Sequence, residues 1–294
     1  LLKGFPGLGR TLIAKSLADV MGLSYGRIQF TPDLLPTDIT GTEVLENEEK
    51  GGGRHFHFFK GPVFANLVLA DEVNRSPART QAALLEVMQE KQVSMGGKTY
   101  FLPKPFILIA TQNTLDSEGV FALGEAQVDR FLGMIEQDFP SEREEKAIVC
   151  RTTGLYDVQI QQAVDPEKIV LMQKLAREVP VVPSVKEFAL NIVRASRGST
   201  EYFDRVIRLG ASPRATQGLI LMAKVTALSR GRFHVRMQDI VDVAVPVLSH
   251  RILLDFRARA EGVTEGEIIQ KLVDYARNLS KPRVSMWTRE LLKA

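Results

Sequence analysis

The chain has 294 residues, 45% of them hydrophobic and 25% charged, which is typical of a soluble globular protein large enough for two hydrophobic cores. The 38 basic residues exceed the 35 acidic ones by only three, so the net charge of +3 gives no support for nucleic acid binding. No apolar run reaches transmembrane length, no signal peptide is recognisable, and a single cysteine excludes an internal disulfide and suits a reducing compartment. We therefore expect a cytoplasmic protein.

Residues 4–11, GFPGLGRT, match the phosphate-binding loop pattern G-x-x-x-x-G-K-[S/T] at every position but one. Glycines can turn successive N–H groups toward phosphate oxygens, and the alanine-rich run 12–18 is predicted as a helix whose N-terminus faces those phosphates. The exception is Arg10, which stands where the pattern has lysine. The residues expected to contact the nucleotide are Gly4, Pro6, Gly7, Leu8, Gly9, Arg10, Thr11 and Leu12.

Only three residues precede this loop, whereas strands usually run about five or six residues. We therefore expect that an upstream segment is missing from this sequence and that it contributes to the base-binding pocket.

The apolar strand 67–70 ends in two carboxylates, Asp71 and Glu72, about sixty residues after the loop, as a Walker B strand does. Asp71 would bind Mg²⁺ together with the Thr11 hydroxyl, and Glu72 would polarise the attacking water. Taken alone, the run could equally be a buried strand that ends in a solvated acidic turn. A second apolar strand, 106–111, leads to Asn113, which could hold the nucleophilic water or cap the next turn.

Alternating strand and helix patterns up to about residue 139 predict a parallel sheet covered by helices. Two alternating segments predict β-hairpins inserted into this layer. One contains Gly51–Gly53 and the run 55–59, and the other, residues 92–101, turns at Gly96 and Gly97.

After Pro140 the pattern becomes helical, so we place an α/β domain at 1–150 and an all-helical lid domain at 151–294. Asp165 and Pro166 indicate a helix start. Cys150 lies in a helical pattern and is expected to be a small buried hydrophobe. Amphipathic patterns cover residues 185–197, 215–228 and 237–245.

Seven motifs in fixed order resemble the MoxR family of AAA+ ATPases. They are residues 4–11, 29–36 with 38–41, 61–66, 71–75, 110–113, 125–131 and 210–215. The resemblance runs from Gly4 to about His250, and the predicted hairpins match two insertions of the AAA+ subgroup that includes MoxR. It implies an AAA+ P-loop NTPase core with a helical lid, with ATP and Mg²⁺ as cofactors.

The resemblance also implies roles for two arginines. Arg130, in Asp129-Arg130-Phe131, resembles an arginine finger that reaches the γ-phosphate in a neighbouring subunit, although it could instead form a surface ion pair with Asp129 or Glu125. Arg214 resembles sensor 2, a second γ-phosphate contact, although it could be a solvated arginine at a helix start. A finger that acts in trans implies a homo-oligomeric ring, typically a hexamer.

Three function classes follow from these residues. The first is an ATPase that remodels or matures partner complexes, with proteins carrying von Willebrand factor A domains as the suspected partners. The second is a nucleotide-binding assembly subunit with impaired hydrolysis, which Arg10 motivates. The third is a DNA motor, which the mild charge and the lack of a basic, aromatic-rich stripe disfavour. The sequence also departs from the family at Thr114, where the family usually has proline.

Overall fold

The computed structural model describes residues 1–47, 54–113, 121–154 and 159–280, which form two compact units. One unit comprises residues 1–174 and the other residues 175–294. The domain boundary placed at residue 150 from the sequence falls inside helix α5 (Glu142–Thr152). Gly51–Gly53 and Thr114, which the sequence analysis discussed, lie outside the described residues.

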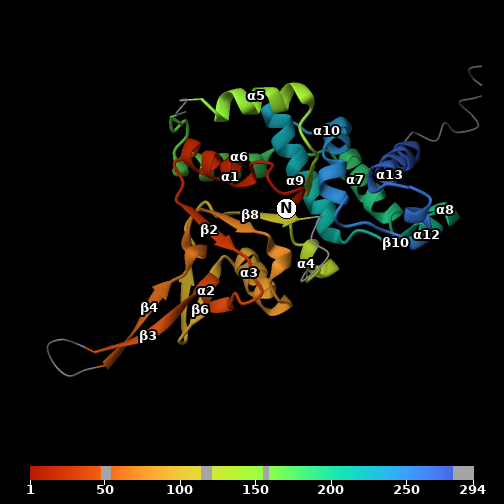
Figure 1. Ribbon diagram of the computed structural model, residues 1–294. Coiled ribbons are helices and arrows are strands. Elements are labelled where there is room, and N and C mark those ends of the chain that lie inside the picture. The colour runs from red at the N-terminus through yellow and green to blue at the C-terminus, as the bar shows by residue number, and fades with distance from the viewer. Residues whose placement is uncertain (48–53, 114–120, 155–158, 281–294) are drawn as a thin grey trace, which may run out of the picture. The chain divides into compact units, whose positions relative to one another are not determined.

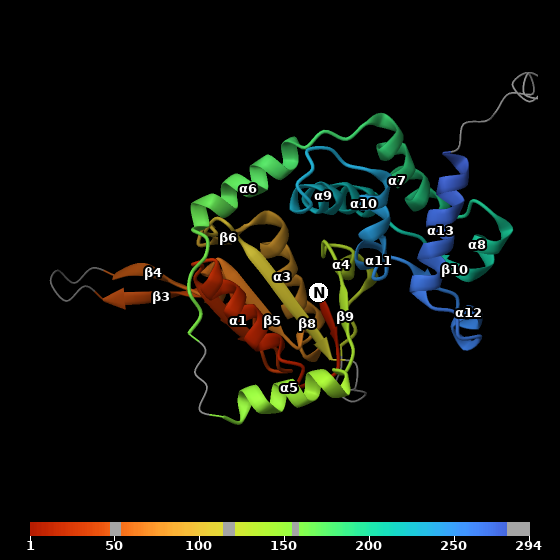
Figure 2. The same ribbon diagram turned by 90° about the horizontal axis from the view of Figure 1, so that it is seen from above.

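The first unit is built on a five-stranded parallel sheet with the strand order β2-β5-β8-β1-β9. Figures 1 and 2 show this sheet with helices beside it. The predicted parallel sheet is therefore confirmed. Because all five strands run in one direction, the residues at their carboxyl ends gather at one edge. The strands are β1 (Leu2–Gly4), β2 (Tyr25–Gln29), β5 (Leu67–Asp71), β8 (Ile107–Asn113) and β9 (Ile135–Gln137).

The fully buried strand β5 shows how the two sheet faces are covered. Successive side chains of a strand point to opposite faces, and Leu67 and Leu69 pack with Ala14 and Ala18 of α1 (Arg10–Val20). The intervening residues Val68 and Ala70 join the core that contains α3 (Ala78–Glu90) on the other face. The helix that follows the P-loop is thus fixed to the sheet by apolar contacts.

Shorter elements complete the first unit. Helix α5 has no buried residue, and its Cys150 is exposed, so the expectation of a buried cysteine is wrong. The pattern 143–150 does form a helix, but no other part of the described chain covers Cys150.

The remaining elements of the first unit are α2 (Pro36–Thr40), η1 (Pro62–Phe64), η2 (Val73–Arg75), α4 (Glu125–Val128) and α6 (Pro166–Glu178), the last of which spans the junction between the units.

Both predicted hairpins are present. They consist of β3 (Gly41–Asn47) with β4 (Arg54–Lys60), and of β6 (Gln92–Met95) with β7 (Lys98–Phe101). The rings of Phe58 and Tyr100 stack at 4.3 Å between centroids, and the Glu43 carboxylate occupies the space beside Gly96 that a Cβ would need. The two hairpins therefore contact each other as well as the sheet.

The second unit is mainly helical, with one addition to the prediction. Strands β10 (Ile207–Leu209) and β11 (Leu253–Leu254) pair antiparallel, so the unit is not purely helical. Its core is formed by apolar side chains of α7, α9 and α13 together with the shorter helices. The helices are α7 (Pro183–Ala195), α8 (Glu201–Val206), α9 (Pro213–Ser229), α10 (Met237–Asp242), α11 (Ala244–Leu248), α12 (Phe256–Ala260) and α13 (Glu265–Leu279).

Candidate nucleotide site

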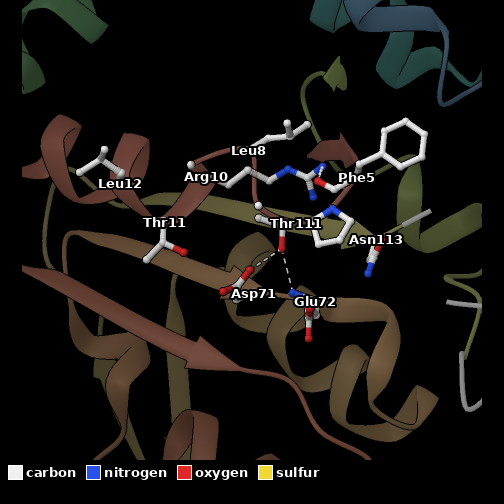
Figure 3. Close-up of a pocket in the computed structure, with 12 residues that line it drawn as sticks. Phe5, Leu8, Arg10, Thr11, Leu12, Asp71, Glu72, Thr111 and Asn113 are labelled. Carbon is white, nitrogen blue, oxygen red and sulfur yellow. Dashed lines mark hydrogen bonds between the residues drawn. The ribbon is translucent and has the colours of Figure 1, made fainter. Parts of the chain in front are cut away.

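A cavity of about 420 Å³ lies at the carboxyl edge of the parallel sheet (Figure 3). It brings together the predicted loop residues from Pro6 to Leu12, Asp71 at the end of β5 with Glu72 directly after it, and the amide at the end of β8. Gly4 is the one predicted loop residue that does not line it, and Phe5 and Thr111 line it without having been predicted as site residues. The lining residues are Phe5, Pro6, Gly7, Leu8, Gly9, Arg10, Thr11, Leu12, Asp71, Glu72, Thr111 and Asn113.

The loop backbone has the form that a phosphate cradle requires. Gly7 and Gly9 have φ angles of 82° and 72°, a left-handed region that costs glycine little. Gly9 is the N-cap of α1 and Arg10 its first residue, so the unpaired N–H groups of the helix N-terminus lie at the cavity. The loop can therefore bind anionic phosphate through its backbone alone.

The Arg10 guanidinium is held at the sheet edge by three oxygen atoms. Its Nε donates to Gln137 Oε1 at 2.9 Å, one amino group to the Phe5 carbonyl at 3.0 Å and the other to the Gln112 carbonyl at 3.3 Å. The residue is only 9% exposed. Burial lowers the pKa of Arg10, while the Asp71 carboxylate acts in the opposite direction. The group that replaces the lysine of the pattern thus donates three hydrogen bonds to protein oxygens.

Gly4 matters for this arrangement through its missing side chain. It pairs with Gln137 in the sheet, and a Cβ at this position would collide with the Gln137 carbonyl and lie 2.7 Å from Arg10 Nη2. The first glycine of the loop is therefore needed where β1, β9 and Arg10 converge, rather than on the cavity wall.

Asp71 is held by groups on both neighbouring strands. The Arg27 guanidinium of β2 lies 2.7 Å from its Oδ2, and the Thr111 hydroxyl of β8 donates to its Oδ1 at 2.7 Å (Figure 3). Thr111 is 1% exposed, and the same hydroxyl accepts the backbone N–H of Glu72 at 2.8 Å. One buried hydroxyl therefore sets the positions of both acidic residues.

Glu72 sits in a left-handed conformation, with φ 56° and ψ 49°, which is uncommon for a residue with a side chain. Its Oε2 accepts from the Gln29 amide and from the Arg75 guanidinium, each at 3.0 Å. In this arrangement Gln29 and Arg75 hold the Glu72 carboxylate.

Asn113 lies at the end of β8, opposite Gly4 in the sheet register. Its carbonyl accepts from the amide of Asn74, a residue of η2 that is 1% exposed, at 3.3 Å. The strand end that carries Asn113 is thereby tied to the turn that follows Glu72.

The two predicted arginines lie elsewhere. Arg130 follows α4, is exposed and does not line the cavity, whereas the next residue, Phe131, is 3% exposed in the core of the first unit. Arg214 lies in the second unit, in the first turn of α9, where Ser212 caps the helix by accepting its N–H at 3.2 Å.

The donor set fits a magnesium nucleotide. Thr11 and Asp71 both line the cavity and offer oxygen ligands, which Mg²⁺ prefers, beside a loop suited to phosphate. The motifs did not point to Arg27, Gln29, Arg75 or Gln137 as partners of the site residues. Arg27 and Gln29 lie two residues apart on β2 and therefore on one face of it, but the sequence does not show that this strand lies next to β5.

Comparison with known protein families gives two matches. Residues 1–133 match the family described as ATPase family associated with various cellular activities (AAA), and residues 202–272 match the AAA lid domain. The chain is 41% identical over 277 residues to "Chaperone MoxR1" of Mycobacterium tuberculosis, covering 93% of this chain and 72% of that protein. The chain belongs to the MoxR family of AAA ATPases.

Other relatives agree with this assignment. "Protein MoxR" of Paracoccus denitrificans is 30% identical over 86% of this chain and 79% of its own length. A crystal structure of a Cytophaga hutchinsonii protein proposed to be an ATPase superposes with a TM-score of 0.85 at 41% identity, covering 93% of this chain and 83% of that one. The expected AAA+ core with its lid is therefore confirmed. No helix in the described part of the chain is long and apolar enough to cross a membrane.

Proposed function

We propose that this MoxR-family protein binds ATP with Mg²⁺, hydrolyses it slowly and uses the cycle to remodel or activate partner protein complexes. The observation that carries the proposal is the cavity where the P-loop, Asp71, Glu72 and Asn113 meet. AAA ATPases share nucleotide binding, and a curated relative bears the name chaperone.

Each residue receives a role from its chemistry. The loop N–H groups hold the phosphates, and Thr11 and Asp71 ligate Mg²⁺, which neutralises phosphate charge when bound. Glu72 orients and polarises the attacking water, and the Asn113 amide holds that water against the γ-phosphate. The Gln29 and Arg75 contacts must loosen for Glu72 to face the water, because both hold its Oε2.

The ring is part of the proposal. Arg130 is exposed beside a buried phenylalanine, which suits a finger presented to the γ-phosphate of a neighbouring subunit in a hexamer. Arg214 supplies a further γ-phosphate contact. The partner class that we would test first is a protein with a von Willebrand factor A domain, in the cytoplasm.

A second candidate function is a nucleotide-binding assembly subunit without turnover. The observation that favours it is the three hydrogen bonds that hold Arg10 at the sheet edge, since a guanidinium held there does not align the γ-phosphate. A DNA motor receives no comparable support from the site. Salt-dependent binding of DNA, measured as a mobility shift, would support this function.

One comparison separates these functions. ATP affinity and phosphate release are measured for the wild-type chain and for Glu72→Gln, which keeps the side-chain shape and removes the carboxylate. Binding by both proteins with release only by the wild type supports the ATPase. Binding without release by either protein supports the assembly subunit, and no ATP binding by either protein overturns both functions.

The partner is sought with the same variant. Glu72→Gln should hold the ring in its ATP-bound state, so that proteins bound to this state co-purify with it. A von Willebrand factor A domain protein retained with ATP and released without it would support the partner class. Retention that does not depend on nucleotide would contradict it.

A further inference from the structure

Gln137 contacts the residue that makes this P-loop unusual. It is the last residue of β9, its Oε1 accepts from Arg10 Nε at 2.9 Å, and it lies 127 residues from Arg10 in the sequence. Gln137 does not line the cavity and belongs to none of the motifs that predicted the site. We therefore infer that Gln137 acts on the site through its contact with Arg10.

We propose that Gln137 is a positioning residue that holds the Arg10 guanidinium at the sheet edge, in competition with the phosphates of ATP. The proposal rests on the proposed function, since it needs nucleotide in the cavity. Arg10 begins the helix whose N-terminus faces the cavity, so its side chain can turn either to the sheet edge or to the phosphates. The two positions exclude each other because one guanidinium cannot satisfy both.

The competition is set by the hydrogen bonds that Arg10 must break. Moving Arg10 to the phosphates breaks its bonds to Gln137, Phe5 and Gln112. The two carbonyl acceptors belong to the backbone and stay in place in any variant, whereas the Gln137 oxygen is supplied by a side chain. A hydrogen bond to a charged group is stronger than one between neutral groups. Loss of the Gln137 oxygen should therefore favour the phosphate-facing position measurably.

The contact is specific to arginine. Nε lies within the fork of the guanidinium, and a lysine at position 10 has no nitrogen at that point of the side chain. The matched variants are Gln137→Met, which keeps the side-chain length and removes the oxygen, and Gln137→Glu, which strengthens the acceptor. Each is made with Arg10 and again with Arg10→Lys, so that a double-mutant cycle isolates the pair.

The readout is ATP affinity in the presence of Mg²⁺, measured by fluorescence with a labelled ATP analogue on proteins whose folding is checked by thermal unfolding. With Arg10 present, Gln137→Met should bind about three- to tenfold more tightly, and Gln137→Glu should bind more weakly by a similar factor. With Arg10→Lys, Gln137→Met should change affinity less than about twofold, because the bond is already absent.

The outcomes separate this proposal from the function on which it rests. Equal effects of Gln137→Met in both backgrounds, or no effect with Arg10 present, would overturn the positioning role while leaving ATP binding intact. If none of the proteins binds ATP, the proposed function itself fails. Should Gln137→Met not fold, Gln137→Glu tests the same pair, and its weakening effect must then be larger with Arg10 than with Arg10→Lys.

Discussion

We expect Arg10 to affect turnover through its geometry rather than through its charge. Lysine is a compact point charge on a flexible stem, whereas arginine carries a wide planar fork that here bonds to the sheet edge. Hydrolysis needs the γ-phosphate aligned with the water at Glu72, and a displacement of about 1 Å can cost about 10²-fold in rate. We therefore expect Arg10→Lys to bind ATP and to release phosphate faster than the wild type. Equal or faster release by the arginine protein in steady-state assays would refute this.

The second prediction at the scale of single residues concerns the Thr111 hydroxyl. Replacing this residue by valine keeps the shape but leaves the Glu72 N–H without its acceptor and removes the donor to Asp71 Oδ1, so that Arg27 remains as the donor to Asp71. An unsatisfied buried donor costs about 1–3 kcal/mol, so kcat should fall by about 10- to 100-fold and more Mg²⁺ should be needed for half-maximal activity.

The control for Thr111 is serine, which keeps the hydroxyl and should restore most of the activity and the Mg²⁺ response in the same titration. If Thr111→Ser were as impaired as Thr111→Val, the methyl group and not the hydroxyl would be responsible.

The motifs in the sequence predicted some residues of the site but not others. Loop glycines and paired acids are local in sequence, so the motifs placed Gly9, Asp71 and Glu72 at one edge, and the structure has them around one cavity. The partners of the charged groups were not predictable, because they depend on strand order. Gln137 reaches Arg10 only because β9 pairs with β1, a fact that the sequence does not encode locally.

Among the elements, the two hairpins are the clearest candidates for partner contacts. Neither contributes a residue to the cavity, and Phe56 and Phe101 on them are 68% and 74% exposed. Shortening either hairpin should leave basal phosphate release within about twofold and impair partner-dependent work, since loops on a rigid scaffold carry recognition. Loss of ATP binding by a shortened but folded protein would contradict this separation of roles.

The turn between α9 and α10 depends on one buried carboxylate. Asp239 has a side chain that is 1% exposed and accepts hydrogen bonds from Arg232 and Arg230 and from the Arg236 N–H. The hydrogen bond from Arg232 is the main reason that the pKa of Asp239 is lowered. Asp239→Asn should lower the free energy of unfolding by about 3 kcal/mol at neutral pH, as removal of a buried ionic partner does.

The pH dependence of that loss has a definite sign. A carboxylate whose pKa is depressed on folding stabilises the protein above its unfolded value of 3.8, and this stability disappears as pH falls through the lower folded value. The difference between wild type and Asp239→Asn in urea titrations should therefore shrink below pH 3.8. Asp242→Asn, at a carboxylate that is 27% exposed, should cost less. A pH-independent difference would show that lost packing, not charge, destabilises the variant.

At the scale of the whole molecule, the order of the two parts could be predicted from the sequence, but their junction could not. The change in composition after Pro140 suggested residue 150, yet compact packing continues to Lys174 because Ile169 of α6 packs with the α1 side of the sheet. Contacts of this kind join segments far apart in the chain, so composition cannot reveal them. The short strands β10 and β11 escaped prediction because two or three residues carry no usable periodicity.

Assembly supplies the prediction at this scale. If Arg130 acts in a neighbouring subunit, Arg130→Ala should abolish turnover and leave ATP affinity nearly unchanged, because the residue lies outside the cavity. Mixing Arg130→Ala with Glu72→Gln subunits should recover part of the phosphate release at junctions that combine an intact finger with an intact acid. No recovery at any mixing ratio would contradict a shared site.

The bond between Arg10 and Gln137 also has an evolutionary consequence. Positions 10 and 137 are distant in the gene, yet we expect the fitness effect of a change at one to depend on the residue at the other. With lysine at position 10, position 137 is free to drift among apolar residues, whereas with arginine the same changes alter the response to ATP. We therefore expect the effect of each substitution to depend on the order in which the two accumulate, and ancestral reconstruction along both orders would reveal that dependence.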